Sequence, residues 1–161
     1  MTRYRSGELF TRDSIKVVDS LKFITPGGKE VYGGGGIIPD VFVGIDTVRT
    51  DALNTVFRPN VHDHVFRYVD ANRFDLEQWD LDAFNKMYVL PADMKQTYKS
   101  DNDLTNLSKT QEELLDRYLK ALVAEQLFDD LGYYRIEAPH DPMIKKVLEL
   151  EKNAGKDVIP L

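Results

Sequence analysis

Three serines with a lysine close by are the first residues that could support peptide-bond hydrolysis, because a neutral lysine can take the proton of a serine nucleophile. The pairs are Ser14 with Lys16, Ser20 with Lys22, and Ser108 with Lys109. The members of the first two pairs would share one face of a strand, but an exposed lysine with a pKa of about 10 cannot act as a base. Ser108 is better explained as a helix cap. We therefore expect no catalytic residue in this chain.

The run His62-Asp63-His64 contains residue types that bind zinc. If residues 61–73 form a helix, side chains two positions apart point about 200° apart around its axis, so one ion does not meet both rings. Asp63 instead suits the first helical turn, where the helix dipole favours a negative charge. His140 precedes a helix start and is expected in a loop. We expect no metal site.

Gly33 to Gly36 invite comparison with a phosphate-binding loop. A dinucleotide-binding fingerprint needs a third glycine three residues after the second, where a helix begins. Ile38 occupies that position, and Pro39-Asp40-Val41 predicts a strand. The glycines therefore indicate a bulge or a close-packed crossing, and no cofactor is expected.

Four aspartates and three large apolar residues complete the candidates for ligand binding. The aspartates are Asp80, Asp82, Asp101 and Asp103; the apolar residues are Trp79, Met87 and Tyr88. The aspartates lack the glycine at position six and the glutamate at position twelve of a calcium loop, so we expect solvated loop carboxylates. The apolar residues are expected in the core or an interface.

The composition is that of an ordinary globular protein, with 161 residues of which 42% are hydrophobic and 30% charged. The absence of cysteine excludes disulfides and thiol catalysis. A net charge of -6 argues against nucleic acid and anionic membrane surfaces as partners. We see neither an apolar run long enough to span a bilayer nor a signal-peptide pattern in residues 1–7.

The N-terminal part predicts a small amount of β-structure after a polar loop over residues 1–20. Residues 21–25 and 30–32 are expected as two strands of a hairpin, joined by a turn at Pro26-Gly27-Gly28-Lys29. Residues 41–43 are expected as a third strand. Two or three short strands are few for an independent sheet, so they are covered by the helical region or join a sheet supplied by other residues.

The remainder predicts helices by its apolar period. Helices are expected over 61–73 with Asn60 as N-cap, over 81–88, from Pro91 towards Tyr98, over 109–131, and from Pro142 through Leu148. The longest has an apolar stripe of Leu115, Leu119, Leu122, Val123, Leu127 and Phe128. Ser108 with Gln111 predicts a capping box, and Gly132 a left-handed C-cap. Residues 133–136 are expected as a short strand or an extended link.

We therefore predict a mostly helical α+β fold, in which a β-hairpin and one added strand are followed by four to five helices. We expect two parts. Residues 1–45 contain a loop, the hairpin, the glycine-rich crossing and a strand, and residues 46–161 form a helical C-terminal domain.

Two runs in the first part carry a family resemblance. They are Ser20-Leu21-Lys22-Phe23-Ile24-Thr25-Pro26-Gly27-Gly28-Lys29 and Gly36-Ile37-Ile38-Pro39-Asp40-Val41. In this order they resemble the segment that follows the catalytic serine and lysine of carboxyl-terminal processing (tail-specific) serine peptidases. The helical remainder looks like the C-terminal extension of certain bacterial, envelope-located members.

The resemblance implies that residues 1–45 are the end of a peptidase core. It further implies that the chain is a non-catalytic C-terminal region that packs on or regulates that core, inactive by itself, in a protein of the cell envelope or periplasm. The implied partners are the rest of the parent peptidase, with its catalytic core and peptide-recognition domain, and through it protein or peptide substrates. Self-association through the β edge is a further expectation.

Two other functions stay open. The chain could be a self-contained helical module that binds a protein or peptide, which a concave apolar patch on a stable monomer would favour. It could also be an enzyme in its own right, but the sequence offers no cluster of titratable residues from which to build a site.

Overall fold

The computed structural model describes residues 7, 10–11, 22–33 and 39–154. These residues contain seven α-helices, one short 3₁₀ helix and a two-stranded hairpin. The predicted mostly helical α+β class is confirmed. The chain divides into two compact units, residues 1–47 and 48–161, each described by itself below. The expected assignment of residues 1–45 to a peptidase core stays a prediction.

The first unit contains the antiparallel hairpin of β1 (Lys22–Ile24) and β2 (Glu30–Tyr32), as predicted. The N–H of Gly28 donates to the carbonyl of Thr25 at 2.9 Å, which closes a β-turn with Pro26 at its first corner. Gly28 has a φ of 78°, a backbone conformation that suits glycine.

The expected third strand is not formed. Val41, Phe42 and Val43 are described but pair with no strand, and the sheet has two strands. An apolar run is not sufficient for a strand, because a strand also needs a neighbour with free backbone groups. Residues 1–6, 12–20 and 34–38, with the predicted loop and most of the glycine run, lie outside the described residues.

The second unit is built from helices joined by short connections. They are α2 (Thr47–Val56), α3 (Val61–Ala71), α4 (Arg73–Leu76), α5 (Leu81–Met87), α6 (Ala92–Asp101), α7 (Lys109–Glu137), the 3₁₀ helix η3 (Ala138–His140) and α8 (Pro142–Ala154). The predicted four to five helices omitted α2 and the four-residue α4. Helix α2 buries only Ala52 and Val56, so its sequence has no apolar stripe to reveal it.

The core lies where α3 and α5 pack against α7. Val61, Val65 and Val69 lie on one face of α3 and are at most 1% exposed. The predicted stripe of α7 packs as expected, with Leu115 and Leu119 fully buried. Phe66 lies on the same helix but is 53% exposed.

Aromatic rings fill the space between α5 and its neighbours. Phe84 and Tyr88 stack with their ring centroids 4.3 Å apart, and Trp79 packs edge-on against both rings. Trp79 and Tyr88 are therefore packing residues, as predicted. Met87 is 63% exposed and lies outside this cluster.

The predicted helix N-caps are formed in part. The capping box is present, since Ser108 Oγ accepts from the N–H of Gln111 at 3.3 Å and Gln111 Oε1 from that of Ser108 at 2.8 Å. Asp141 Oδ1 accepts from the N–H of Met143 at 2.7 Å and so caps α8. Asn60 occupies the N-cap position of α3, but its side chain makes no capping hydrogen bond.

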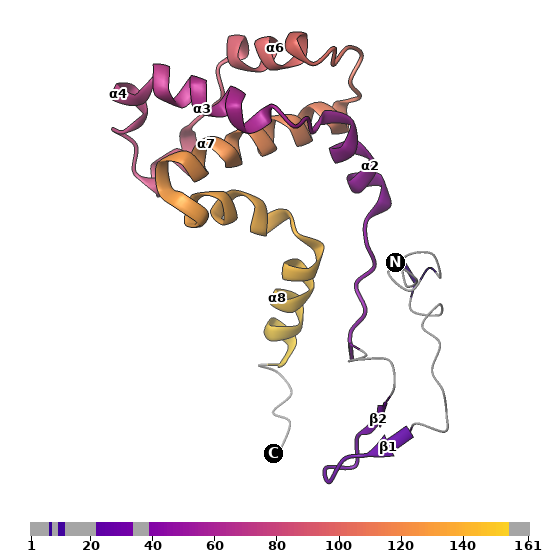
Figure 1. Cartoon of the computed structure of the whole chain (residues 1–161). Helices are drawn as coiled ribbons and strands as arrows, with labels where there is room; N and C mark the ends of the chain where they lie inside the picture. The colour runs from indigo at the N-terminus through magenta and orange to yellow at the C-terminus, as the bar shows by residue number, and fades with distance from the viewer. Residues whose placement is uncertain (1–6, 8–9, 12–21, 34–38, 155–161) are drawn as a thin grey trace. The chain divides into compact units, whose positions relative to one another are not determined.

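The end of the longest helix differs most from the prediction. Helix α7 reverses direction at Phe128 and Asp129, and its second half folds back beside the first (Figure 1). Asp129 takes the positive φ of 56° that the sequence suggested for Gly132. Residues 133–136, expected as a strand or link, are helical.

Gly132 is buried at this reversal. A Cβ built on it would lie 2.2 Å from the carbonyl oxygen of Ala124, closer than any real contact. The glycine is therefore required by the close approach of the two halves of α7 and not by a left-handed cap.

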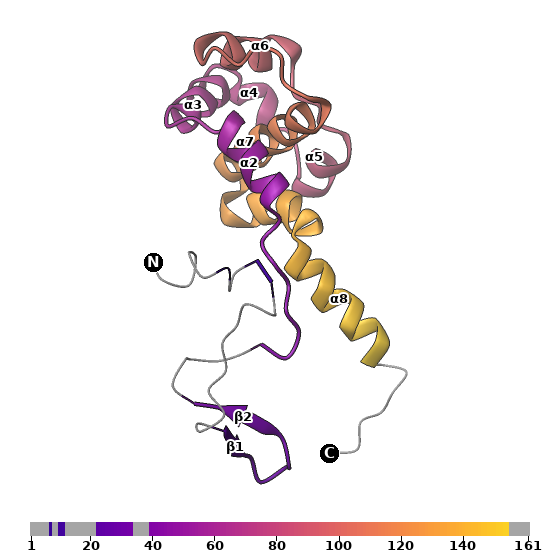
Figure 2. The ribbon, with the colours of Figure 1, turned by 90° about the vertical axis from the view of Figure 1, so that its right-hand side faces the viewer.

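Helix α8 extends away from the other helices of its unit (Figure 2). Its apolar residues are all at least partly exposed, among them Val147 at 62% and Leu148 at 48%. The predicted helix is confirmed, although its apolar face is not covered by the described residues.

Gly132→Ala should destabilise the helical unit by about 2–3 kcal/mol, because a backbone oxygen blocks the added methyl group. At an open helical site the same change would instead raise the free energy of unfolding by about 1 kcal/mol. The sign of the change therefore distinguishes a blocked site from an open one. Urea unfolding followed by circular dichroism measures it. Gly27→Ala, which meets nothing within 4 Å, is the control and should leave the transition unchanged. An unchanged or higher midpoint for Gly132→Ala would contradict the close approach.

Candidate functional site

The serine–lysine neighbours do not form a catalytic pair among the described residues. Lys22 Nζ pairs with Glu30 Oε1 at 2.6 Å across the hairpin, and Ser108 caps α7. Ser14, Lys16 and Ser20 lie outside the described residues.

The two neighbouring histidines lie in α3 and point to different environments. His64 is part-buried, with Nε2 3.1 Å from the carbonyl oxygen of Met94 and its ring beside that of Tyr98. His62 is exposed. Within the residues that the structure describes, no group of three histidine, cysteine, aspartate or glutamate residues could hold a metal ion.

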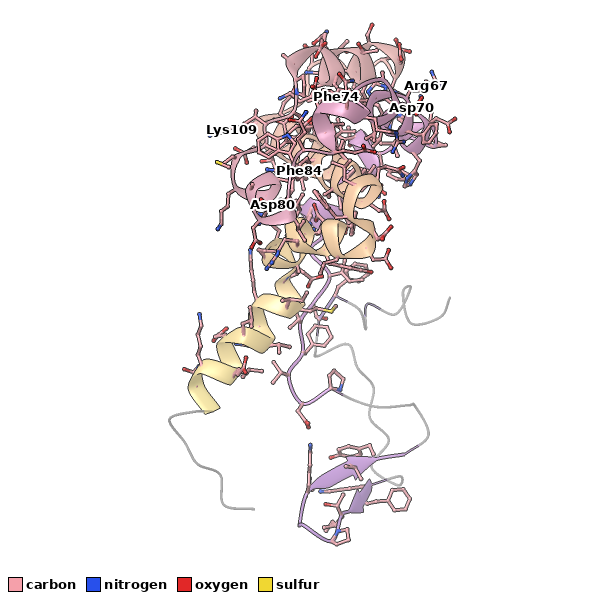
Figure 3. The ribbon with its side chains drawn as sticks, turned by 90° about the vertical axis from the view of Figure 1, so that its left-hand side faces the viewer. Arg67, Asp70, Phe74, Asp80, Phe84 and Lys109 are labelled. Carbon is pink, nitrogen blue, oxygen red and sulfur yellow. The ribbon has the colours of Figure 1, made fainter. Side chains whose placement is uncertain are left out.

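Two of the four aspartates stabilise helices. Asp80 Oδ1 accepts from the N–H of Ala83 at 2.8 Å and caps α5 (Figure 3). Asp82 lies inside α5 and pairs with Arg135 at 3.0 Å, so it is not the predicted loop carboxylate, whereas Asp80 is an exposed residue that precedes the helix. Asp101 ends α6, and Asp103 follows it with a φ of 54°.

A cleft in the helical unit is the candidate binding site. Its volume is about 720 Å³. Residues from the end of α5, from α6, from both halves of α7 and from η3 line it. The lining residues are Asn85, Tyr88, Val89, Leu90, Lys95, Glu113, Asp116, Arg117, Lys120, Arg135, Ile136, Pro139 and His140. This size and this mixture of apolar and charged groups suit a small ligand or a peptide side chain.

Lys120 binds the end of α5. Its Nζ donates to the carbonyl oxygens of Asn85 at 2.9 Å and Tyr88 at 2.8 Å, which are left without helical partners where α5 ends. The ammonium also lies 5.7 Å from the centre of the Phe84 ring. Burial lowers the pKa of Lys120, because the charged form loses water.

Glu137 accepts from two arginines behind the cleft. Its Oε1 accepts from Arg117 Nε at 2.9 Å and its Oε2 from Arg49 NH2 at 3.0 Å. The Glu137 side chain is only 13% exposed. One carboxylate thus serves two guanidinium groups.

His140 lies at the rim of the cleft beside these arginines. Partial burial, reinforced by the charge of Arg117, lowers the pKa of His140, although Glu137 acts in the opposite direction. The neutral form of the ring is therefore favoured.

Lys95 of α6 and Asp116 of α7 pair within the cleft. Lys95 Nζ lies 2.8 Å from Asp116 Oδ1 and donates to Oδ2 at 2.9 Å. Two other cations of the lining are also paired, Arg117 with Glu137 and Arg135 with Asp82. The charges of the cleft are therefore largely balanced by ion pairs.

The sequence analysis did not identify this site. Its residues are spread from position 85 to position 140, and the reversal of α7 brings the last of them to the first. The available signal was the spacing of Arg117 and Lys120, which places two cations on one face of a predicted helix.

Comparisons with known proteins found one family model that matches part of the helical unit. The model of a family of unknown function (DUF8443) matches residues 53–129, a little under half of the chain. No curated protein and no solved structure matches. No described helix is long and apolar enough to cross a membrane. The peptidase resemblance of residues 20–43 therefore stays a prediction.

Glu137→Gln should lower the free energy of unfolding by about 2–3 kcal/mol, since two partly buried guanidinium groups lose their carboxylate. Urea unfolding measures the change. Asp82→Asn removes an exposed pair with Arg135 and is the matched control, with an expected cost below about 0.5 kcal/mol. Equal effects for both variants would contradict the role of Glu137.

Proposed function

We propose that this chain is the non-catalytic C-terminal region of a carboxyl-terminal processing serine endopeptidase. In this proposal the β-hairpin joins the sheet of the peptidase core, and the helical unit packs on or regulates that core. The observation that carries the proposal is a hairpin whose apolar face is exposed in the part of the chain that the structure describes.

The register of the hairpin defines that face. Phe23 lies directly opposite Val31, so both side chains project to one side of the ribbon. Phe23 is 59% exposed and Val31 is 38% exposed. Two strands of three residues are at most marginally stable in water. An exposed apolar pair on so short a hairpin is expected if the remaining strands of the sheet, and the core that covers them, belong to another part of the protein.

The sequence supports the same assignment. The first run that resembles the peptidase family contains β1 and the turn of the hairpin. The second run ends at Val41, where an expected strand pairs with nothing in the described part of the chain. A core that supplies neighbouring strands would give residues 41–43 their partner. The parent's catalytic serine and lysine would then precede this chain, and a cell-envelope or periplasmic location follows from the family resemblance.

A second function is favoured by the cleft. A self-contained helical module that binds a protein or peptide needs a concave surface with apolar and charged groups, and the α5–α7 cleft is one. The two functions are compatible if the module belongs to the peptidase.

Hydrogen exchange on the isolated chain separates the two units. We expect amides of Phe23 and Val31 to exchange rapidly, because so short a hairpin opens readily, and those of Leu115 and Leu119 to be protected. Strong protection of the hairpin in a clean monomer would contradict the proposed dependence on a missing sheet and would favour the self-contained module.

Phe23→Asp tests the joining of the core's sheet. In the isolated chain the change should leave the unfolding midpoint unaltered, because Phe23 is exposed and lies outside the helical core. In the full-length protein it should lower peptidase activity about tenfold or more, by placing a carboxylate in an apolar contact. Release of peptides from an unfolded protein substrate measures activity.

Phe74→Asp is the matched control, since Phe74 is 83% exposed on α4 (Figure 3). It should retain activity. The proposal is overturned if the native protein, isolated with an antibody against the helical unit, lacks peptidase activity, or if Phe23→Asp has no effect in it.

A further inference from the structure

We infer that α8 pairs in parallel with α8 of a second copy of this chain, so that the apolar face of the helix is buried in a two-stranded coiled coil. The inference concerns a surface to which the proposed function assigns no role. It does not require that the parent be a peptidase.

The apolar face of α8 is exposed along the helix. The large apolar side chains exposed on it are Met143, Ile144, Val147, Leu148 and Leu150. The helix extends away from the other helices of its unit, which leave this face uncovered (Figure 2). A contiguous apolar surface in water is unfavourable, and on a folded protein it marks an interaction site.

The spacing of these residues is that of a coiled-coil seam. Met143, Val147 and Leu150 follow one another at intervals of four and three residues, which correspond to the heptad positions d, a and d. A β-branched residue at position a with leucine at position d favours two parallel strands. Val147 and Leu150 follow that rule, so the sequence of α8 suits a parallel dimer.

Two charged residues beside the seam complement each other between copies. Lys146 precedes Val147 and takes heptad position g, whereas Glu151 follows Leu150 and takes position e. In a parallel pair, position g of one helix lies beside position e of the next heptad in the other helix, where opposite charges set partner and orientation. Lys146 of each copy would therefore lie beside Glu151 of the other, and the two-fold symmetry forms this ion pair twice.

Both charged residues are available for these pairs. Glu151 is exposed and makes no ion pair with another described residue. Lys146 pairs with Glu149 of its own helix at 2.9 Å, but pairs at the surface contribute little to stability. An ammonium group has three N–H donors, so Lys146 can reach an acceptor on a second helix as well.

The position of Glu151 argues against a membrane as the partner of this face. A helix that binds an anionic membrane surface carries mainly lysine and arginine beside its apolar residues. In α8 a carboxylate lies next to Leu150, and the chain has a net charge of -6. A second copy accounts for Glu151 because it supplies the lysine.

Sedimentation velocity of the whole chain measures the association. A helix of 13 residues is about 20 Å long, so two copies bury less area than a standard protein interface. We therefore expect a dissociation constant of about 10–100 μM. The weight-average mass should rise from monomer to dimer between about 1 μM and about 1 mM, by mass action. A chain that is monomeric throughout this range overturns the inference.

Val147→Asp tests the seam. Val147 is exposed and lies outside the core, so the variant should unfold at the same urea concentration as the unaltered chain. It should weaken the dimer about tenfold or more, because it places two carboxylates in an apolar contact. Val48→Asp introduces the same charge at an exposed valine of α2, and as the matched control it should dimerise normally. Equal dimerisation of the two variants overturns the inference, as does loss of the dimer in Phe23→Asp of the hairpin.

Exchange of the two charges tests the parallel pairing. Lys146→Glu and Glu151→Lys should each weaken the homodimer about threefold or more, because each places like charges side by side. An equimolar mixture of the two variants should associate about as tightly as the unaltered chain, since both ion pairs are then of opposite sign. The double variant should recover for the same reason. Unaltered association of both single variants, or a mixture that does not recover, overturns the parallel pairing.

Lys109→Glu is the matched control for the change of net charge. Lys109 is a 91% exposed lysine of α7 and is labelled in Figure 3. Its variant has the same net charge as Lys146→Glu and should dimerise as the unaltered chain does. A loss of association equal to that of Lys146→Glu would assign the effect to net charge and overturn the pairing of α8.

Discussion

The close approach of Gly132 to Ala124 is the constraint on which the rest of the helical unit depends. Because no side chain separates the two backbones, the second half of α7 folds back along the first. That reversal places Glu137 beside Arg117, twenty residues earlier in the chain, and carries Ile136 and His140 to the cleft. Gly132, which was expected to end a helix, therefore allows the reversal that forms the cleft.

The reversal of α7 has an unfavourable backbone term and favourable burial and ion-pair terms. Asp129 has a φ of 56° and a ψ of -159°, close to a region that normally only glycine adopts, which costs on the order of 1–3 kcal/mol. Burial of Ile136 and the pairing of Glu137 with Arg49 and Arg117 act against that cost. The ion pairs are thus part of the fold as well as of the cleft.

Local signals in the sequence predicted local structure well. Ser108 with Gln111 identified the start of α7, since a capping box depends only on residues within one turn. The reversal of α7 was not predicted, because it depends on the contact between Ala124 and Gly132. The spacing of apolar residues along the sequence does not indicate that contact. The cleft was missed for the same reason, and the third strand was expected wrongly because residues 41–43 lack a partner strand.

The two units differ in how far their own buried side chains stabilise them. The helical unit has a continuous core of fully buried side chains from α3, α5 and α7, with helix ends capped by Ser108, Asp80 and Lys120. The hairpin has no buried side chain of its own among the described residues. Since burial of apolar surface is the main term that stabilises a fold, the hairpin has little stabilisation of its own, which is why we propose that it joins a larger sheet. A self-sufficient module joined to a dependent strand pair is the arrangement expected where a helical domain follows the last strands of a larger sheet.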